Sequence, residues 1–371
     1  MIENLIPTKL FVGENILKNN QKELIIGKKA FIVTGKTSGE KSGALSDVIK
    51  ILEEENTEYF VYNKITNNPT IEETVEGGKV CNEWGADFII GIGGGSPLDA
   101  AKAIAVYAKN TPSEESEFKM YDIFKDDYRN DPLPMVAIPT TAGTGSEATP
   151  YSILTLHKEK TKRSFASQRV FYKKAFIDGR YTINLPLQIA RNTYVDALCH
   201  LIEGYTNKKS SEKTDDVALY GLKIMGRNKE RILNGNFDVD CCTDLLYGST
   251  VGGAVIAHTG TTIIHSMGYP ITYYKDIPHG MANGMLLIEY LKRTKEVLSK
   301  KVDNILNALG FNTLKEFEEY INEILKVQEK FCLEEVKEWT KTTILSKNVA
   351  VCPFYVDYDE EINIFKICLK I

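Results

Sequence analysis

The stretch DFIIGIGGGSPLDAAKAIAVYAK, residues 87–109, decides the fold class of this 371-residue chain. It begins as a short apolar run typical of a buried strand, turns through Gly93–Gly95, and continues with a helical period. We expect Ser96 to cap this helix and Pro97 to take its first position. A strand that passes through a glycine turn into a helix is the repeating unit of a parallel α/β sheet.

The rest of the chain divides into two halves with different patterns. Strand and helix patterns alternate up to about residue 182, in the segments at residues 28–36, 70–86, 133–154 and 173–178. Beyond about residue 185 the apolar residues follow a helical period. We therefore predict an α/β domain with a mostly parallel, Rossmann-like sheet at residues 1–182, and an all-helical domain at residues 183–371. A ligand cleft between two such domains is the default expectation.

Composition excludes several classes of function. The 45 basic and 50 acidic residues give a net charge of -5 and form no basic stripe, so we expect no nucleic acid and no membrane as partner. We see no signal peptide and no apolar run long enough to span a bilayer. The seven cysteines are odd in number and show no C-x-x-C spacing, which indicates reduced thiols and a cytoplasmic protein.

Two loops have the composition of a phosphate-binding site. Backbone N–H groups in the glycine turn, at the start of a helix, favour an anion, although a tight turn can need glycine for its geometry alone. The standard dinucleotide fingerprint is imperfect here, because Ser96 stands where glycine or alanine is usual. The second loop, PTTAGTGSEATP at residues 139–150, adds hydroxyl groups and two further glycines. Two such loops at neighbouring strand ends suit a long phosphorylated cofactor.

The segment VDALCHLIEGY, residues 195–205, places a carboxylate and an imidazole four residues apart in an apolar run. Asp196 and His200 would share one helical face, either as a simple hydrogen-bonded pair or as half of a metal site. Two further histidines favour the metal: His265 ends a helix-like run, and His279, fourteen residues later, opens another. One carboxylate and three imidazoles form a coordination set for a divalent transition metal.

The other two histidines, His157 and His258, lack such surroundings, and we interpret both as structural or incidental.

Five ordered motifs together resemble the iron-containing (group III) alcohol dehydrogenase family, especially its 1,3-propanediol and butanol dehydrogenase-like members. The motifs are NNPT at residues 67–70, GGGSPLDAAK at 93–102, IPTTAGTGSE at 138–147, DALCHLIEGY at 196–205, and H-x13-H-G at 265–280.

The resemblance implies a role for each matching residue. It implies metal binding by Asp196, His200, His265 and His279. It implies that Gly94, Gly95 and Ser96 form the turn that binds the pyrophosphate of the cofactor. It also implies further cofactor contacts by Asn68, Pro69, Asp99, Thr140, Thr141, Thr144, Thr149 and Lys162.

Two departures from the family pattern bear on the cofactor and on proton transfer. Related proteins carry an acidic residue at the end of the strand that here ends in Gly35, and that acid repels a 2′-phosphate. Gly35, with Lys36 and Ser38 beside it, can host the phosphate instead, so we predict NADP(H) in preference to NAD(H). Many relatives also carry a histidine where this chain has Tyr269, which makes Tyr269 a candidate proton relay.

The resemblance implies a metal-dependent, NAD(P)-dependent alcohol dehydrogenase. We expect reversible reduction of short aldehydes to alcohols or diols by hydride transfer, with a metal polarising the substrate oxygen. The metal is expected to be Fe(II), with Zn(II) as the other possibility, and the protein a homodimer or larger homo-oligomer. The alternatives are a glycerol dehydrogenase-like zinc enzyme, a dehydroquinate synthase-like lyase, and a nucleotide-binding protein without catalysis.

Overall fold

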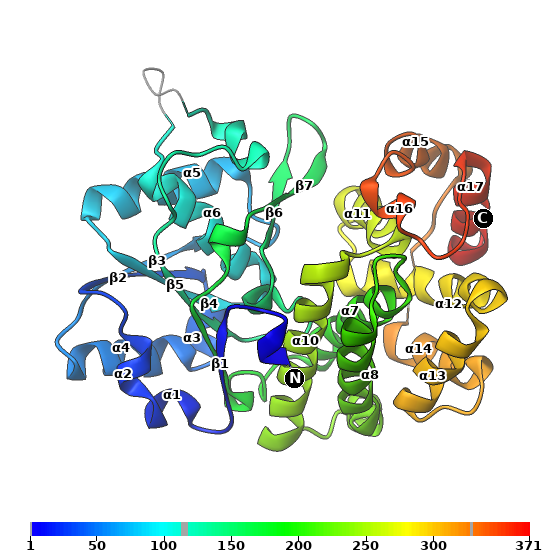
Figure 1. The fold of residues 1–371 in the computed structure, drawn as a ribbon, viewed down its shortest axis with the longest axis horizontal. Helices are drawn as coiled ribbons and strands as arrows, with labels where there is room; N and C mark the ends of the chain where they lie inside the picture. Colours follow the sequence, from blue (N-terminus) through cyan, green and yellow to red (C-terminus); the bar gives the residue numbers. More distant parts are fainter. Residues whose placement is uncertain (1, 113–117, 327–328) are drawn as a thin grey trace. The chain divides into compact units, whose positions relative to one another are not determined.

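The computed structural model describes residues 2–112, 118–326 and 329–371 (Figure 1). These residues form two compact units, the first made of residues 3–185 and 238–250, the second of residues 186–237 and 251–371. The first unit is α/β and the second is helical, which confirms the predicted fold class. None of the helices in the described ranges combines the length and apolarity that crossing a bilayer requires.

The first unit is built on a six-stranded parallel sheet with the order β1-β8-β5-β4-β2-β3. Its strands are β1 (Lys9–Val12), β2 (Lys29–Gly35), β3 (Glu58–Ile65), β4 (Phe88–Gly93), β5 (Met135–Pro139) and β8 (Lys174–Ile177). A separate antiparallel hairpin is formed by β6 (Tyr151–Leu156) and β7 (Thr161–Ala166).

The strand order reverses between β2 and β4. From β2 the chain first moves outward to β3, then returns to add β4 and β5 on the other side of β2. Strands β2 and β4 pair in parallel from Ala30–Phe88 to Thr34–Ile92, so their carboxyl ends, Gly35 and Gly93, lie at the same end of the sheet. In open α/β sheets, ligands bind outside the carboxyl ends of the strands at such a reversal.

Helices cover both faces of the sheet. They are α1 (Ile16–Asn19), α2 (Gln21–Leu24), α3 (Ser38–Lys41), α4 (Ala44–Glu54), α5 (Ile71–Trp84) and α6 (Gly95–Lys109), with 3₁₀ segments η1 (Ile2–Asn4), η2 (Met120–Lys125), η3 (Ser146–Ala148), η4 (Gln168–Val170) and η5 (Gly179–Tyr181).

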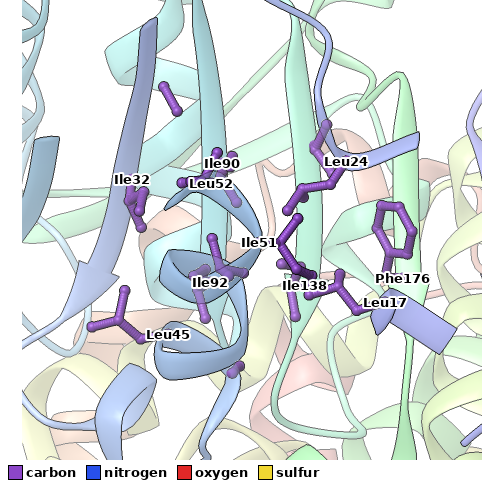
Figure 2. Close-up of a cluster of buried hydrophobic side chains, with 14 of the residues drawn as sticks. Leu17, Leu24, Ile32, Leu45, Ile51, Leu52, Ile90, Ile92, Ile138 and Phe176 are labelled. Atoms are coloured by element: carbon purple, nitrogen blue, oxygen red, sulfur yellow. The ribbon is translucent and has the colours of Figure 1, made fainter. Parts of the chain in front are cut away.

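One face packs against α1, α2 and α4. Figure 2 shows Ile51 and Leu52 of α4 beside strand residues such as Ile90 and Ile138, all buried in one apolar cluster. The alternation of side chains along β4 sends Gly91 to the other face. There a Cβ on Gly91 would lie 3.0 Å from Leu98 Cδ2 of α6, so glycine permits this close helix approach.

The regular structure of the second unit is helical in the residues that the structure describes. Its helices are α7 (Leu187–Thr206), α8 (Glu212–Arg227), α9 (Lys229–Asn234), the later part of α10 (Val239–Thr259), α11 (Ile263–Lys275), α12 (His279–Val297), α13 (Ser299–Leu309), α14 (Leu314–Leu325), α15 (Leu333–Thr343), α16 (Lys347–Ala350) and α17 (Tyr358–Leu369). Residues 238–250 belong to the first unit, so the chain returns to that unit after the second has begun. A division of the chain into two continuous domains at residues 182/183 does not include this return.

Three local predictions were wrong. Helix α6 begins at Gly95 with Gly94 as its N-cap, so Ser96 lies inside the first turn and Pro97 is the third helical residue, not the first. The Ser96 hydroxyl instead accepts a hydrogen bond from the backbone N–H of Asn68 at 3.1 Å. His265 lies in the first turn of α11 and does not end the preceding run, because α10 stops at Thr259.

Candidate metal centre and cofactor loops

Three helices of the second unit bring four polar side chains together. Asp196 and His200 lie four residues apart on α7 and therefore share one face of that helix. His265 comes from the start of α11, and His279 is the first residue of α12. Asp196, His200 and His265 are all buried, each with 5% or less of its surface exposed.

Their donor atoms face a common point. The Nε2 atoms of His200 and His265 are 2.9 Å apart. The Oδ1 atom of Asp196 lies 3.7 Å from Nε2 of His265 and 3.9 Å from Nε2 of His279. One ligand atom each from Asp196, His265 and His279 lies within 4.8 Å of the others, and His200 joins this group through His265.

These separations fit a small divalent ion. Two ligand atoms that are each about 2.1 Å from one ion are about 3.0 Å apart at a right angle, and about 4.2 Å apart on opposite sides. The three distances above, 2.9, 3.7 and 3.9 Å, fall in or near this range. Ligand atoms as far apart as the 4.8 Å limit of the group would move roughly half an ångström closer when an ion binds. Oxygen and imidazole donors suit Fe(II), Zn(II), Co(II) and Mn(II). A four-donor set also leaves a position for a substrate oxygen.

Gly280 allows α12 to approach α7 at this point. A Cβ on Gly280 would lie 1.8 Å from the backbone oxygen of Asn192 and 3.0 Å from Cβ of Asp196. No side chain fits that space, because 3.4 Å is the beginning of ordinary contact. The glycine that follows His279 is therefore what lets His279 lie beside Asp196.

The groups of the cluster shift one another's pKa values, so that the carboxylate favours its negative form and the imidazole of His265 its positive form. Burial works to raise the pKa of Asp196, but the three imidazoles and the amide of Asn283 outweigh it and hold that pKa below its ordinary value. Burial works to lower the pKa of His265, but Glu203 and Asp196 beside it raise that pKa above its ordinary value. The cluster thus stabilises the negative carboxylate of Asp196 among imidazoles that can carry positive charge.

Sequence reasoning missed two residues that support this cluster. Asn283 donates from Nδ2 to Oδ1 of Asp196 at 2.9 Å, and the same nitrogen lies 3.2 Å from Nε2 of His279. Glu203 hydrogen-bonds with Nδ1 of His265. The available signal was spacing: Asn283 lies four residues after His279, and Glu203 lies three residues after His200, each on the helical face of a candidate ligand.

Tyr269 lies at the edge of the cluster. Its ring stacks on that of His279, with centroids 5.5 Å apart and planes 10° from parallel. The remaining two histidines lie elsewhere: His157 is in the exposed turn of the β6–β7 hairpin, and His258 is exposed near the end of α10.

The glycine turn and the threonine loop of the first unit pack directly on each other. A Cβ on Gly94 would lie 2.8 Å from Oγ1 of Thr141, and one on Gly95 would lie 2.6 Å from Cγ2 of Thr144. Thr140 donates its backbone N–H to the oxygen of Gly93 at 2.9 Å. The two motifs therefore form one continuous surface of backbone and hydroxyl groups at the strand ends.

A buried lysine anchors the threonine loop from within. Lys102 is fully buried, and its Nζ donates to the backbone oxygens of Ser146, Thr149 and Tyr151 at 2.6 to 3.0 Å. Burial lowers the pKa of Lys102 to about 8. Asp99 accepts from the Ser146 hydroxyl at 2.6 Å. The polar groups of Asp99 and Thr149 are thus engaged within the protein, where they hold the shape of the loop.

The NNPT motif joins the glycine turn to the β6–β7 hairpin. Asn68 has a positive φ of 58°, and besides its bond to Ser96 its Oδ1 accepts from Nζ of Lys162 at 2.7 Å. The backbone oxygen of Pro69 accepts from N–H of Thr155 at 2.8 Å. Three predicted cofactor residues that are far apart in sequence therefore meet at one edge of the sheet.

The chain is exposed just after the end of β2. Gly35 ends the strand and is followed by the exposed side chains of Lys36 and Ser38. A Cβ on Gly35 would meet Oγ of Ser38 at 2.7 Å, a flexible side chain that can rotate away. A larger residue at position 35 is therefore sterically possible.

Comparison with known proteins covers most of the chain. A family model described as iron-containing alcohol dehydrogenase matches residues 7–179, and one described as the C-terminal part of the Fe-containing alcohol dehydrogenase family matches residues 190–334.

Two relatives and one solved structure illustrate the similarity. The 1,3-propanediol dehydrogenase of Citrobacter freundii is 28% identical over 84% of this chain and 80% of its own. The NADPH-dependent butanol dehydrogenase of Clostridium saccharobutylicum is 26% identical over 88% and 83%. The crystal structure of an iron-containing alcohol dehydrogenase from Thermotoga maritima superposes with a TM-score of 0.89, at 35% identity, covering 99% of both chains.

Proposed function

Because the chain belongs to the iron-containing alcohol dehydrogenase family, we propose that it interconverts short aldehydes with their alcohols or diols, using NADP(H). It is a metal-dependent alcohol dehydrogenase, and we assign the metal to Asp196 and the three histidines His200, His265 and His279. The observation that supports this assignment is the convergence of these donor atoms within a few ångströms.

The residues of the cluster hold and orient the reacting groups. A divalent ion at this position, when bound, polarises a substrate carbonyl and stabilises negative charge on its oxygen. The carboxylate of Asp196 lowers the net charge of the set, and the imidazoles fix its geometry. Nicotinamide supplies or accepts the hydride, so reduction of the aldehyde consumes one hydride and one proton.

The cofactor is proposed to lie on the loops at the strand reversal. The glycine turn offers backbone N–H groups at the start of α6 for the pyrophosphate. Thr140, Thr141 and Thr144 line the neighbouring loop, and Asn68 with Lys162 lies beside the turn. These contacts would fix the position of the nicotinamide, which is the main contribution of a protein to hydride transfer.

A preference for NADP(H) is part of the proposal. It is supported by the absence of a carboxylate at Gly35, by the cation of Lys36 and by the hydroxyl of Ser38. A Gly35→Asp variant is expected to lose NADPH efficiency while keeping NADH efficiency, because the new carboxylate would repel a 2′-phosphate. The measurement is kcat/KM for both cofactors, and an unchanged ratio would refute the preference.

Tyr269 is proposed as the proton relay because its ring lies against His279. Replacement by phenylalanine keeps the stacked ring and removes only the hydroxyl. The expected result is a lower kcat with a changed pH profile, and a Tyr269→Phe enzyme identical to wild type would exclude the role.

Metal identity, location and assembly complete the proposal. We propose Fe(II) as the physiological ion, with Zn(II) as a competent substitute. The seven free cysteines support a reducing cytoplasmic location. A homodimer or larger homo-oligomer remains a prediction, which light scattering in solution tests.

The experiment that tests the function is metal-dependent turnover. Protein purified without oxygen, stripped by a chelator and reloaded with Fe(II), is assayed with NADPH and a panel of short aldehydes. We expect activity only after reloading, lost in His279→Ala and kept in His258→Ala, which removes an exposed histidine near the end of α10. Activity that survives stripping, or that His279→Ala retains, would overturn the proposal.

A further inference from the structure

Glu203 is a fully buried carboxylate that no part of the mechanism above uses. It lies on α7, three residues after His200, and so on the same helical face as Asp196 and His200. Its Oε1 atom accepts three hydrogen bonds from the start of α11: from N–H of Thr262 at 2.8 Å, from Oγ1 of Thr262 at 2.6 Å, and from N–H of Ile264 at 3.0 Å.

The second oxygen of Glu203 faces a candidate ligand. Its Oε2 atom lies in hydrogen-bond contact with Nδ1 of His265. An ionised carboxylate can only accept hydrogen bonds, so Nδ1 must carry the proton. In the neutral ring, Nε2 then presents its lone pair, and this is the atom that faces His200 and Asp196.

We propose that Glu203 is the positioning residue that fixes His265 in the tautomer able to bind the metal, an inference that rests on the proposed function. Glu203 performs this task while its other oxygen accepts from the first N–H groups of α11, the helix that carries His265. One carboxylate therefore sets both the position of the ring and the location of its proton. Partners of this kind orient ligands and typically change metal affinity about 10- to 100-fold.

The replacement of Glu203 by glutamine separates these two tasks. Three donors at the start of α11 require an acceptor, so the glutamine oxygen is expected to remain there. Its NH₂ group must then face His265, and because NH₂ donates, Nδ1 of His265 has to accept. The ring proton moves to Nε2, where it blocks coordination, although shape, volume and the start of α11 are preserved.

The first readout needs no metal. Long-range ¹H–¹⁵N spectra of metal-free protein, with labelled histidine and at alkaline pH, report which ring nitrogen carries the proton. The chain has only five histidines, which makes the assignment tractable. We expect the Nδ1–H form of His265 in wild type and the Nε2–H form in Glu203→Gln. An Nε2–H form in wild type would overturn the inference.

The second readout is metal affinity, measured by competition with a chromogenic chelator. We expect Glu203→Gln to bind Fe(II) and Zn(II) about 10- to 100-fold more weakly than wild type. The control is Thr262→Val, which removes one bond to Oε1 but leaves the contact with His265, and should keep the wild-type tautomer and affinity. Equal weakening by Thr262→Val would assign the effect to the helix start and refute the role.

The two hypotheses fail in different ways. If wild type bound no divalent metal, the proposed function would fail, while the tautomer spectra would still decide whether Glu203 orients His265. If wild type bound metal and Glu203→Gln bound it equally well with an unchanged tautomer, only the role of Glu203 would be lost.

Discussion

Replacing Gly280 by alanine tests whether the close approach of α12 to α7 assembles the metal centre. The added Cβ would lie 1.8 Å from the backbone oxygen of Asn192, where ordinary contact begins at 3.4 Å. The first turn of α12 would therefore have to withdraw from α7 by about 1.6 Å. His279 is the preceding residue, so its ring would move away from Asp196 by a similar distance.

The expected magnitude follows from this displacement. Misplacing a functional group by about 1 Å can cost about 100-fold in activity, and overpacking a close contact costs about 1 to 3 kcal/mol of stability. We expect Gly280→Ala to fold with a reduced melting temperature, to lose about 100-fold in activity, and to bind Fe(II) about 10- to 100-fold more weakly. Chelator competition measures the affinity, and circular dichroism measures the melting.

The matched control is Met281→Ala, a half-buried position in the same turn. It should lose some packing but leave His279 in place and metal affinity near that of wild type. Wild-type metal affinity in Gly280→Ala would refute the claim that this glycine is required to bring the ligands together.

Two further predictions concern stability. Gly179→Ala should lower the free energy of unfolding in urea by about 1 to 3 kcal/mol, because the added Cβ would lie 2.3 Å from the backbone oxygen of Val239. The control is Gly35→Ala, whose Cβ would be close only to the rotatable hydroxyl of Ser38 and which should cost much less. Equal losses of stability in the two variants would contradict this prediction. Burial raises the pKa of Glu361 from 4.5 to about 7, so the folded protein holds a proton that the unfolded chain releases, and stability from this group falls as pH rises between these values. The stability of Glu361→Gln relative to wild type should therefore rise by up to about 3 kcal/mol between pH 4.5 and 8. Replacing the exposed Glu323 by glutamine should give no such rise. Parallel curves of stability against pH for wild type and Glu361→Gln would exclude the effect.

Local patterns were sufficient for much of the α/β unit. The apolar runs around Ile32, Ile90 and Val136 have no polar face, and each became a strand buried on both sides. The glycine turn after β4 and the predicted helix that follows it also occur in the structure. Periodicity could predict these elements because burial and backbone freedom act over a few residues.

Contacts between distant segments were beyond local reasoning. Ser96 has the composition of a helix cap, but its hydroxyl accepts from Asn68, twenty-eight residues earlier, and Gly94 caps the helix instead. His265 follows a helical pattern, yet Gly260, with a φ of 73°, lies just after the end of that helix, and α11 begins at Ile263. In both cases a tertiary or turn constraint overrode the local preference.

The candidate site shows the same division. Residue chemistry and family resemblance selected Asp196 and the three histidines, and the structure brings them together. Glu203 was missed because a glutamate in a helix is usually solvated, and its partner His265 lies sixty-two residues away. Only the three-dimensional packing of α11 on α7 identifies it as a buried partner.

X-ray absorption of the Fe(II)-loaded protein is the decisive test of the four-residue metal site, because it identifies the ligands of the ion. We expect the iron to have only nitrogen and oxygen neighbours at about 2.0 to 2.2 Å, with the multiple scattering of three imidazole rings. Loss of one ring in His200→Ala should be visible in the same spectrum. A sulfur neighbour at about 2.3 Å, or an unchanged spectrum in that variant, would contradict the assignment of the metal to Asp196, His200, His265 and His279.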